Sequence, residues 1–121
     1  MPYNEMLEAN INAVWLEAFP DFQGAVEVKK MFGGLVYLYR GKMTVGIVGD
    51  DLMARVPSQK MQEILEEDAV RPMDFTGRTM KEFVFVGAPG FSGPGQLARW
   101  VRLGLEHARI QLTKNKAQPG K

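Results

Sequence analysis

Apolar residues recur at helical spacing near both ends of the chain. The first set lies between Asn4 and Pro20 and is Leu7, Ile11, Val14, Trp15 and Ala18. Because asparagine is a good N-cap and proline ends a helix, this spacing predicts a helix from about Asn4 to Phe19. Gly93 and Pro94 introduce a second set, and proline suits the first helical position. That set predicts a long final helix and comprises Leu97, Trp100, Val101, Gly104, Leu105, Ala108 and Leu112.

Between these helices the pattern changes to the alternating or apolar runs that are typical of strands. Four such runs follow one another closely: residues 26–31, 35–39, 43–48 and 51–56. Turns around Gly41 and Gly49 join the last three, and connections this short link only antiparallel neighbours. The pattern therefore predicts a three-stranded antiparallel meander with the first run as a fourth strand beside it.

The second half of the chain predicts a shorter helix and two further strands. Ser58 is a suitable N-cap for a helix that follows Pro57. Residues 71–75 are expected at a sheet edge, because Pro72 lacks the N–H group that a strand ladder needs. Residues 81–86 are apolar on both faces, which indicates a buried strand or an interface. The whole order is α-β-β-β-β-α-β-β-α, an α+β fold with a mostly antiparallel sheet and helices packed on one face.

Two glycine-rich stretches are candidates for phosphate binding. Such a loop should lead into a helix, where backbone N–H groups and the helix dipole meet the anion. Gly33 and Gly34 precede a strand instead, so a bulge or a turn with positive φ is favoured. The loop at 89–95 does lead into the final helix but contains no lysine or arginine, so a connector is favoured there.

The composition fits a single domain, assigned to residues 1–113 with a polar tail at 114–121. The 121 residues include no cysteine, which excludes disulfides and thiolate chemistry. His107 is the only histidine, so no metal site and no cofactor is expected, and the side chain is interpreted as solvated. The net charge of +1 gives no bulk attraction for nucleic acid. No signal peptide and no apolar run of about 18 residues is visible, so a cytoplasmic protein without membrane insertion is expected.

Two basic clusters are the remaining candidate sites. One combines Arg71, Arg78 and Lys81 around Asp74, and it could hold a phosphate or an acidic peptide, or use Asp74 as the general base of a small enzyme. An ion pair that stabilises the turn is the alternative favoured for these residues. The other cluster lies on the polar side of the final helix and comprises Arg99, Arg102, Arg109, Lys114 and Lys116. It predicts either a nucleic-acid surface or a solvated helix face.

Five spaced motifs between about Val28 and Ala108 resemble the stand-alone members of the TfoX N-terminal domain family. They are Lys30-Met31-Phe32-Gly33-Gly34, Gly41-Lys42-Met43, Gly49 to Val56, Arg71 to Arg78 with Met80-Lys81 and Phe83-Val84, and Leu97 with Trp100-Val101. The chain departs from the family pattern at Thr79, at Glu82, where glycine is frequent, and at Thr44, where a cysteine or an aromatic residue is common. The resemblance implies an α+β fold similar to that of secretion chaperones, and it implies little about activity.

The residues and the resemblance together favour a non-catalytic regulatory or protein-interaction module. A protein partner or a homodimer is expected, and a homodimer would form through a sheet edge or an uncovered sheet face. Two alternatives remain open at this point. One is a nucleic-acid-associated regulator that uses the basic C-terminal helix, and the other is a small enzyme or anion-binding site around Asp74 and Arg78.

Overall fold

A computed structural model of the chain confirms the predicted α+β fold and its element order. The structure describes the backbone of residues 4–31, 33–75, 78–91 and 93–117, and the side chains of these residues apart from 22, 23, 74, 75, 78–81, 94 and 114–117. In chain order the elements are α1 (Glu5–Ala18), η1 (Pro20–Ala25), β1 (Val26–Met31), β2 (Gly34–Tyr39), β3 (Lys42–Val48), β4 (Asp51–Arg55), η2 (Ser58–Lys60), α2 (Met61–Ile64), β5 (Val70–Phe75), β6 (Arg78–Val86), η3 (Ala88–Gly90) and α3 (Pro94–Ala117), where η marks a 3-10 turn.

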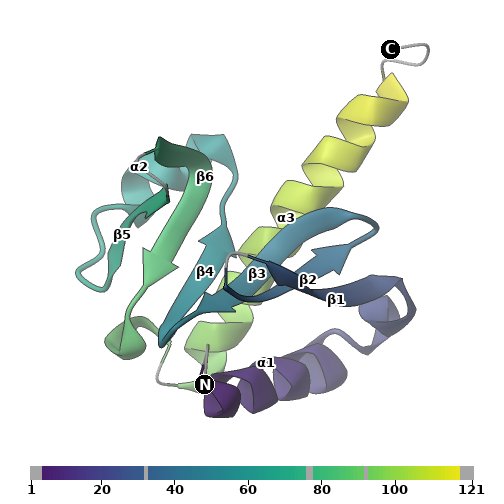
Figure 1. Ribbon diagram of the computed structural model, residues 1–121. Helices are drawn as coiled ribbons and strands as arrows, with labels where there is room; N and C mark the ends of the chain where they lie inside the picture. The colour runs from purple at the N-terminus through teal and green to yellow at the C-terminus, as the bar shows by residue number, and fades with distance from the viewer. Residues whose placement is uncertain (1–3, 32, 76–77, 92, 118–121) are drawn as a thin grey trace.

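All six strands pair antiparallel, in the spatial order β1-β2-β3-β4-β6-β5 (Figure 1). The meander from β1 to β4 follows the chain order, as the sequence predicts. β6 then lies beside β4, and β5 takes the outer position, so Pro72 lies in an edge strand as expected. The sheet is strongly twisted, and the strands at its two ends run in clearly different directions (Figure 1).

The helix ends follow the sequence except at Ser58 and at the C-terminal end. Asn4 caps α1, since its Oδ1 accepts hydrogen bonds from two N–H groups of the first turn at 2.9 and 3.1 Å. The predicted Ser58 cap is wrong, because its side chain hydrogen-bonds to Glu82 and caps neither η2 nor α2. α3 continues to Ala117, so the helix includes part of the segment expected as a polar tail.

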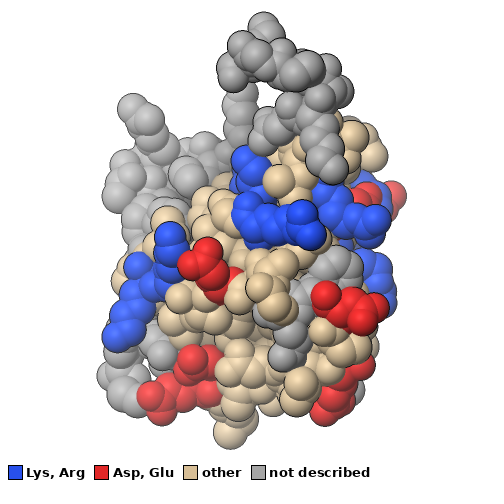
Figure 2. All heavy atoms as spheres, turned by 90° about the vertical axis from the view of Figure 1, so that its right-hand side faces the viewer, with Lys and Arg blue, Asp and Glu red and all other residues tan. Residues whose placement is uncertain are grey.

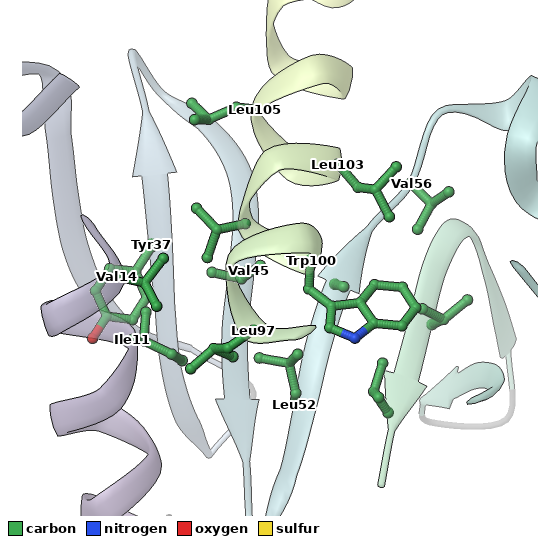
Figure 3. Packing of buried hydrophobic residues seen from close by; sticks show 14 of the residues in the cluster. Ile11, Val14, Tyr37, Val45, Leu52, Val56, Leu97, Trp100, Leu103 and Leu105 are labelled. Carbon is green, nitrogen blue, oxygen red and sulfur yellow. The ribbon is translucent and has the colours of Figure 1, made fainter. Parts of the chain in front are cut away.

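The main core lies between the sheet and the two long helices, α1 and α3, which cover one sheet face (Figures 1 and 3). Trp100 extends from α3 over the β4 and β6 side of the sheet, while Ile11 and Val14 of α1 lie beside Tyr37 (Figure 3). The other face has a smaller cluster of its own, made of Val36, Leu38, Met53, Met73, Phe83 and Phe85. β6 is therefore buried on both faces, as its sequence predicts.

The Gly33-Gly34 pair has a structural role at the β1–β2 turn. Gly33 has a φ of +77°, which glycine adopts without strain. Gly34 permits a close approach of two strands, because a Cβ on it would lie 1.8 Å from the backbone oxygen of Ile47 in β3. The turn leads directly into β2 and not into a helix, which agrees with the structural interpretation favoured from the sequence.

Candidate functional site

Arg71 is the one member of the predicted Asp74 cluster whose side chain the structure describes. It extends from the edge strand β5 and donates a hydrogen bond to Oδ2 of Asp51 in β4 at 2.5 Å. Its guanidinium carbon also lies 5.0 Å from the ring centre of Phe85, within the range of a cation–π contact. Arg71 thus has an acidic partner and an aromatic neighbour that the sequence did not suggest.

The rest of the predicted cluster is described only through its backbone. Asp74 lies opposite Thr79 in the β5–β6 hairpin, and Arg78 begins β6 on the far side of the turn. The side chains of Asp74, Arg78 and Lys81 lie outside the described residues. The pairing of Asp74 with Arg78 and the anion site around it therefore stay predictions.

His107 is buried, so its interpretation as a solvated side chain is wrong. Only 2% of it is exposed, and its Nε2 lies 2.9 Å from Oε1 of Glu82. The residue is on the border of the apolar stripe of α3, and its burial is decided by β6, which lies 25 residues away in sequence at the contact. Its Nδ1 has no hydrogen-bond partner among the described residues.

Glu82 holds this contact from a left-handed backbone conformation, with a φ of +67°. Burial raises the pKa of Glu82, but the hydrogen bond and charge of His107, the charge of Arg55 and a hydrogen bond from Ser58 outweigh it. The pKa therefore lies below its ordinary value of 4.5, and the carboxyl is ionised at neutral pH. The signal for this site was present in the sequence, since Glu82 occupies a position where the resembled family often has glycine, the residue that suits positive φ.

The polar cluster of Ser58, Glu82 and His107 lacks the order of a nucleophilic triad. A triad places the histidine between the hydroxyl and the acid, so that the imidazole takes the hydroxyl proton. Here the acid lies between the other two groups, because Glu82 hydrogen-bonds to both Ser58 and His107. Arg55 adds a cation nearby, and burial lowers the pKa of its guanidinium while the charge of Glu82 raises it. The cluster therefore joins α3 to the sheet and offers no activated nucleophile.

A groove of about 670 Å³ runs along the outer part of α3, beside the end of α1. We call it the α3 groove, and its lining is Phe19, Arg102, Leu105, Glu106, Arg109, Ile110 and Thr113. Phe19 is the residue that ends α1, and it contributes an apolar ring opposite the helix. Arg102 and Arg109 are seven positions apart and therefore lie on the same side of α3. The groove thus combines an apolar surface with two arginines.

The three described arginines on the polar side of α3 differ in their availability. Arg99 donates two hydrogen bonds to the Glu67 carboxylate, one of them at 3.0 Å, and these bonds lower the pKa of Glu67. Arg102 lies over the Phe19 ring at 5.9 Å. Neither Arg102 nor Arg109 forms an ion pair with a described residue, and both are exposed. Two guanidinium groups therefore remain available at the groove.

The one acidic residue of the α3 groove is already paired. Glu106 accepts from Nζ of Lys60 in η2 at 3.0 Å, so its charge is balanced from outside the groove. On the face of the molecule shown in Figure 2, one group of Lys and Arg side chains lies across the upper part and a second group lies lower at the left, while most Asp and Glu side chains lie in the lower half. The charge left at the α3 groove is positive, and an anionic ligand complements it.

The glycine-rich loop at 89–95 borders a second hollow, of about 570 Å³, between α1 and the start of α3. The described part of the loop is anchored, since Trp100 Nε1 donates to the Gly90 carbonyl at 2.9 Å and the Gly93 N–H donates to Gln96 at 3.0 Å. Glu17 lies in the wall of this hollow, and its charge opposes an anion at the helix start. These contacts favour the connector role expected for the loop.

Metal and membrane chemistry gain no support from the part of the chain that the structure describes. There, no three His, Asp or Glu side chains come together in a way that would hold a metal ion. None of the helices described is both long enough and apolar enough to cross a membrane.

Comparison with known proteins adds the family to this geometry. Neither the curated proteins nor the solved structures give a match. A model of the TfoX N-terminal domain matches residues 17–108, which is most of the chain and includes the whole sheet. The chain therefore belongs to the TfoX N-terminal domain family.

Proposed function

We propose that this protein is a non-catalytic interaction module whose α3 groove holds an acidic, partly apolar segment of a protein partner. The observation that carries the proposal is the pair of exposed guanidiniums, Arg102 and Arg109, beside the apolar groups of Phe19, Leu105 and Ile110. A segment with carboxylates beside apolar side chains complements both parts of this surface. Arginine suits such a ligand because its planar fork binds a carboxylate through two hydrogen bonds.

A binding role also agrees with how the polar residues are used. Glu82 pairs with the buried His107 in a partly buried contact, and Ser58 hydrogen-bonds to the acid and not to the imidazole. This arrangement supports a structural role for the hydroxyl, imidazole and carboxylate groups, which a hydrolytic enzyme would need for catalysis.

Nucleic-acid binding by the C-terminal helix is the alternative, and the described contacts favour it less. Arg99 is occupied by Glu67, which removes one of the cations expected on that surface. The apolar groups of the α3 groove add nothing to binding of a phosphate backbone, which is recognised mainly through charge and polar contacts. A peptide ligand makes use of the whole groove.

The test is a fluorescence anisotropy titration with a labelled helical peptide that carries glutamates on one face and leucines at i and i+4. The double variant Arg102→Glu/Arg109→Glu should bind this peptide at least about tenfold more weakly than the unchanged protein, a loss of about 1.4 kcal/mol. Arg71→Glu, which makes on β5 the charge change of one of these two substitutions, is the control and should bind normally. A second peptide with lysines in place of the glutamates should prefer the double variant.

The possible outcomes separate the three candidate functions. Equal binding by the unchanged protein and the double variant contradicts the α3 groove as the site. Loss of binding in Arg71→Glu alone points to the predicted site around Asp74. If a labelled DNA duplex binds the unchanged protein and the acidic peptide does not, the nucleic-acid alternative replaces the proposal.

A further inference from the structure

The edge strand β1 presents its outer backbone groups to solvent. The Arg40 N–H donates to the Ala25 carbonyl at 3.0 Å, which makes these two residues a hydrogen-bonded pair of the antiparallel β1–β2 ladder. Such pairs alternate along a ladder. In the continuous register of β1 with β2, the N–H and C=O groups of Val26, Val28 and Lys30 therefore point away from β2. No described residue hydrogen-bonds to them from that side.

The side chains along this edge are also exposed. Residues 27–30 are all solvent-exposed, and β1 has neither a proline nor a bulge that would block a further strand. On the helix side, Val26 and Val28 line a shallow hollow of about 340 Å³ with Trp15 and Leu16 of α1. Val28 is 48% exposed and Leu16 is 60% exposed, so apolar side chains remain exposed beside α1 on this side of the edge.

We propose that β1 pairs antiparallel with β1 of a second copy of the chain, about a two-fold axis at Val28. In this register Val28 lies opposite its own copy, and Val26 lies opposite Lys30 of the second copy. These are the residues whose backbone groups point outward, so they form the hydrogen-bonded pairs that the ladder requires. The two sheets then join into one continuous sheet of twelve strands, twice the six of one chain.

Charge complementarity selects this register. Glu27 lies opposite Lys29 of the second copy, and Lys29 lies opposite Glu27, so the symmetric pair contains two opposite-charge contacts. Both contacts fall at non-hydrogen-bonded positions, where facing side chains are closer together. The two neighbouring symmetric registers have their two-fold axis at residue 27 or at residue 29. They place Glu27 opposite Glu27 or Lys29 opposite Lys29, and facing like charges are destabilising. The sequence Glu27-Val28-Lys29 thus favours one symmetric pairing and opposes its nearest competitors.

The apolar side of the edge adds to the same pairing. Residues that lie opposite each other in a sheet share a face, so the two Val28 side chains meet on the side that α1 covers. The hollow beside Leu16 and Val26 is then continued by Val28 of the second copy, while Lys30 of the second copy lies opposite Val26. Because one pair of short strands is a small interface, the dimer should dissociate on dilution.

The test is sedimentation velocity of the full chain at protein concentrations up to about 1 mM, the upper end of weak association. The unchanged protein should form dimers, and Glu27→Lys or Lys29→Glu alone should weaken association at least about tenfold. The double swap Glu27→Lys/Lys29→Glu should restore it, because the opposite charges again face each other. A 1:1 mixture of the two single variants should form heterodimers for the same reason. Glu66→Lys, an identical charge change at an exposed residue between α2 and β5, should leave association unchanged.

Any other result overturns the proposal. A monomer at all concentrations excludes the dimer, and a dimer that both single variants leave intact excludes this edge. A double swap that fails to restore association excludes the register. Equal weakening by Glu66→Lys shows that net charge and not pairing controls the association. The result is independent of the proposed function, because the strand β1 contributes no residue to the lining of the α3 groove.

Discussion

Glu82 combines a strained backbone conformation with a partly buried contact to His107. Its φ of +67° is unfavourable for a residue with a Cβ. In return, its backbone oxygen accepts from the Val56 N–H at 2.8 Å, and its carboxylate binds the buried His107. A glycine would remove the strain and lose the carboxylate. The glutamate is therefore retained against a backbone preference by contacts that lie far apart in sequence.

This balance predicts an unusual order of stability for two variants. Glu82→Ala and Glu82→Gly both remove the partner of His107, which should cost about 1–3 kcal/mol of unfolding free energy. Glu82→Gly should recover about 1 kcal/mol relative to Glu82→Ala, because glycine adopts a positive φ freely. Urea unfolding at neutral pH measures the difference, with Glu66→Ala as an exposed control. An alanine variant as stable as the glycine variant would show that the backbone is not strained there.

At the scale of elements, the position of α3 on the sheet depends on a close contact with β3. Thr44 lies beside an irregularity in the β2–β3 ladder, and its hydroxyl donates to the Tyr37 carbonyl at 2.8 Å. Gly104 of α3 packs against the backbone of Thr44, and a Cβ on Gly104 would lie 2.6 Å from the backbone carbonyl oxygen of Thr44. The helix can approach this closely only because the residue has no side chain.

Gly104→Ala should therefore destabilise the protein, although alanine is the better helix former. The added methyl group forces α3 away from β3, and overpacking of this kind typically costs about 1–3 kcal/mol, more than the roughly 1 kcal/mol gained in helix propensity. Gly95→Ala is the matched control, because a Cβ there meets nothing within 4 Å, and it should be neutral or stabilising. Thermal unfolding of both variants gives the comparison. Equal effects would contradict a tight α3–β3 contact.

At the scale of the whole molecule, two surface ion pairs connect α3 to the segment between β4 and β5. Lys60 pairs with Glu106 at 3.0 Å, and Arg99 binds Glu67 through two hydrogen bonds. The hydrogen bonds from Arg99 hold the pKa of Glu67 below its ordinary value of 4.5. All four side chains of these two pairs are more than a third exposed, so each pair contributes only a small amount to the free energy of unfolding at neutral pH.

The lowered pKa of Glu67 predicts the pH dependence of this contribution. A group whose pKa is lower in the folded state stabilises the fold above its unfolded pKa and loses that effect as the pH falls through the folded value. The stability of the protein should therefore decrease as the pH falls below about 4.5, the ordinary value for glutamate. Arg99→Met should make this decrease shallower, and Arg109→Met, which loses no ion pair to a described residue, should not. Chemical unfolding at a series of pH values gives the slopes, and parallel slopes for the two variants would contradict the role of Arg99.

Much of the fold followed from local patterns in the sequence. The cap at Asn4, the turn at Gly33 and the strand at β1 each depend on residues within a few positions of one another, so they were predicted correctly, although the alternation in β1 does not bury one of its faces, since residues 27–30 are all exposed. The partner of Arg71, the burial of His107 and the hydrogen bond of Ser58 depend on residues from other strands. Those contacts had no local signal in the sequence. The one exception is Glu82, the partner of His107, which stands where the family often has glycine.

The sequence by itself determined the elements, the antiparallel meander and the apolar faces, because periodicity and turn chemistry act over short distances along the chain. The tertiary structure alone decided which polar groups remain free. Arg99 and Glu106 are paired across elements, whereas Arg102 and Arg109 form no ion pair with any described residue, and β1 is left at an open edge. These outcomes depend on how strands and helices meet in space, and residues that are distant in sequence carry no local record of that meeting.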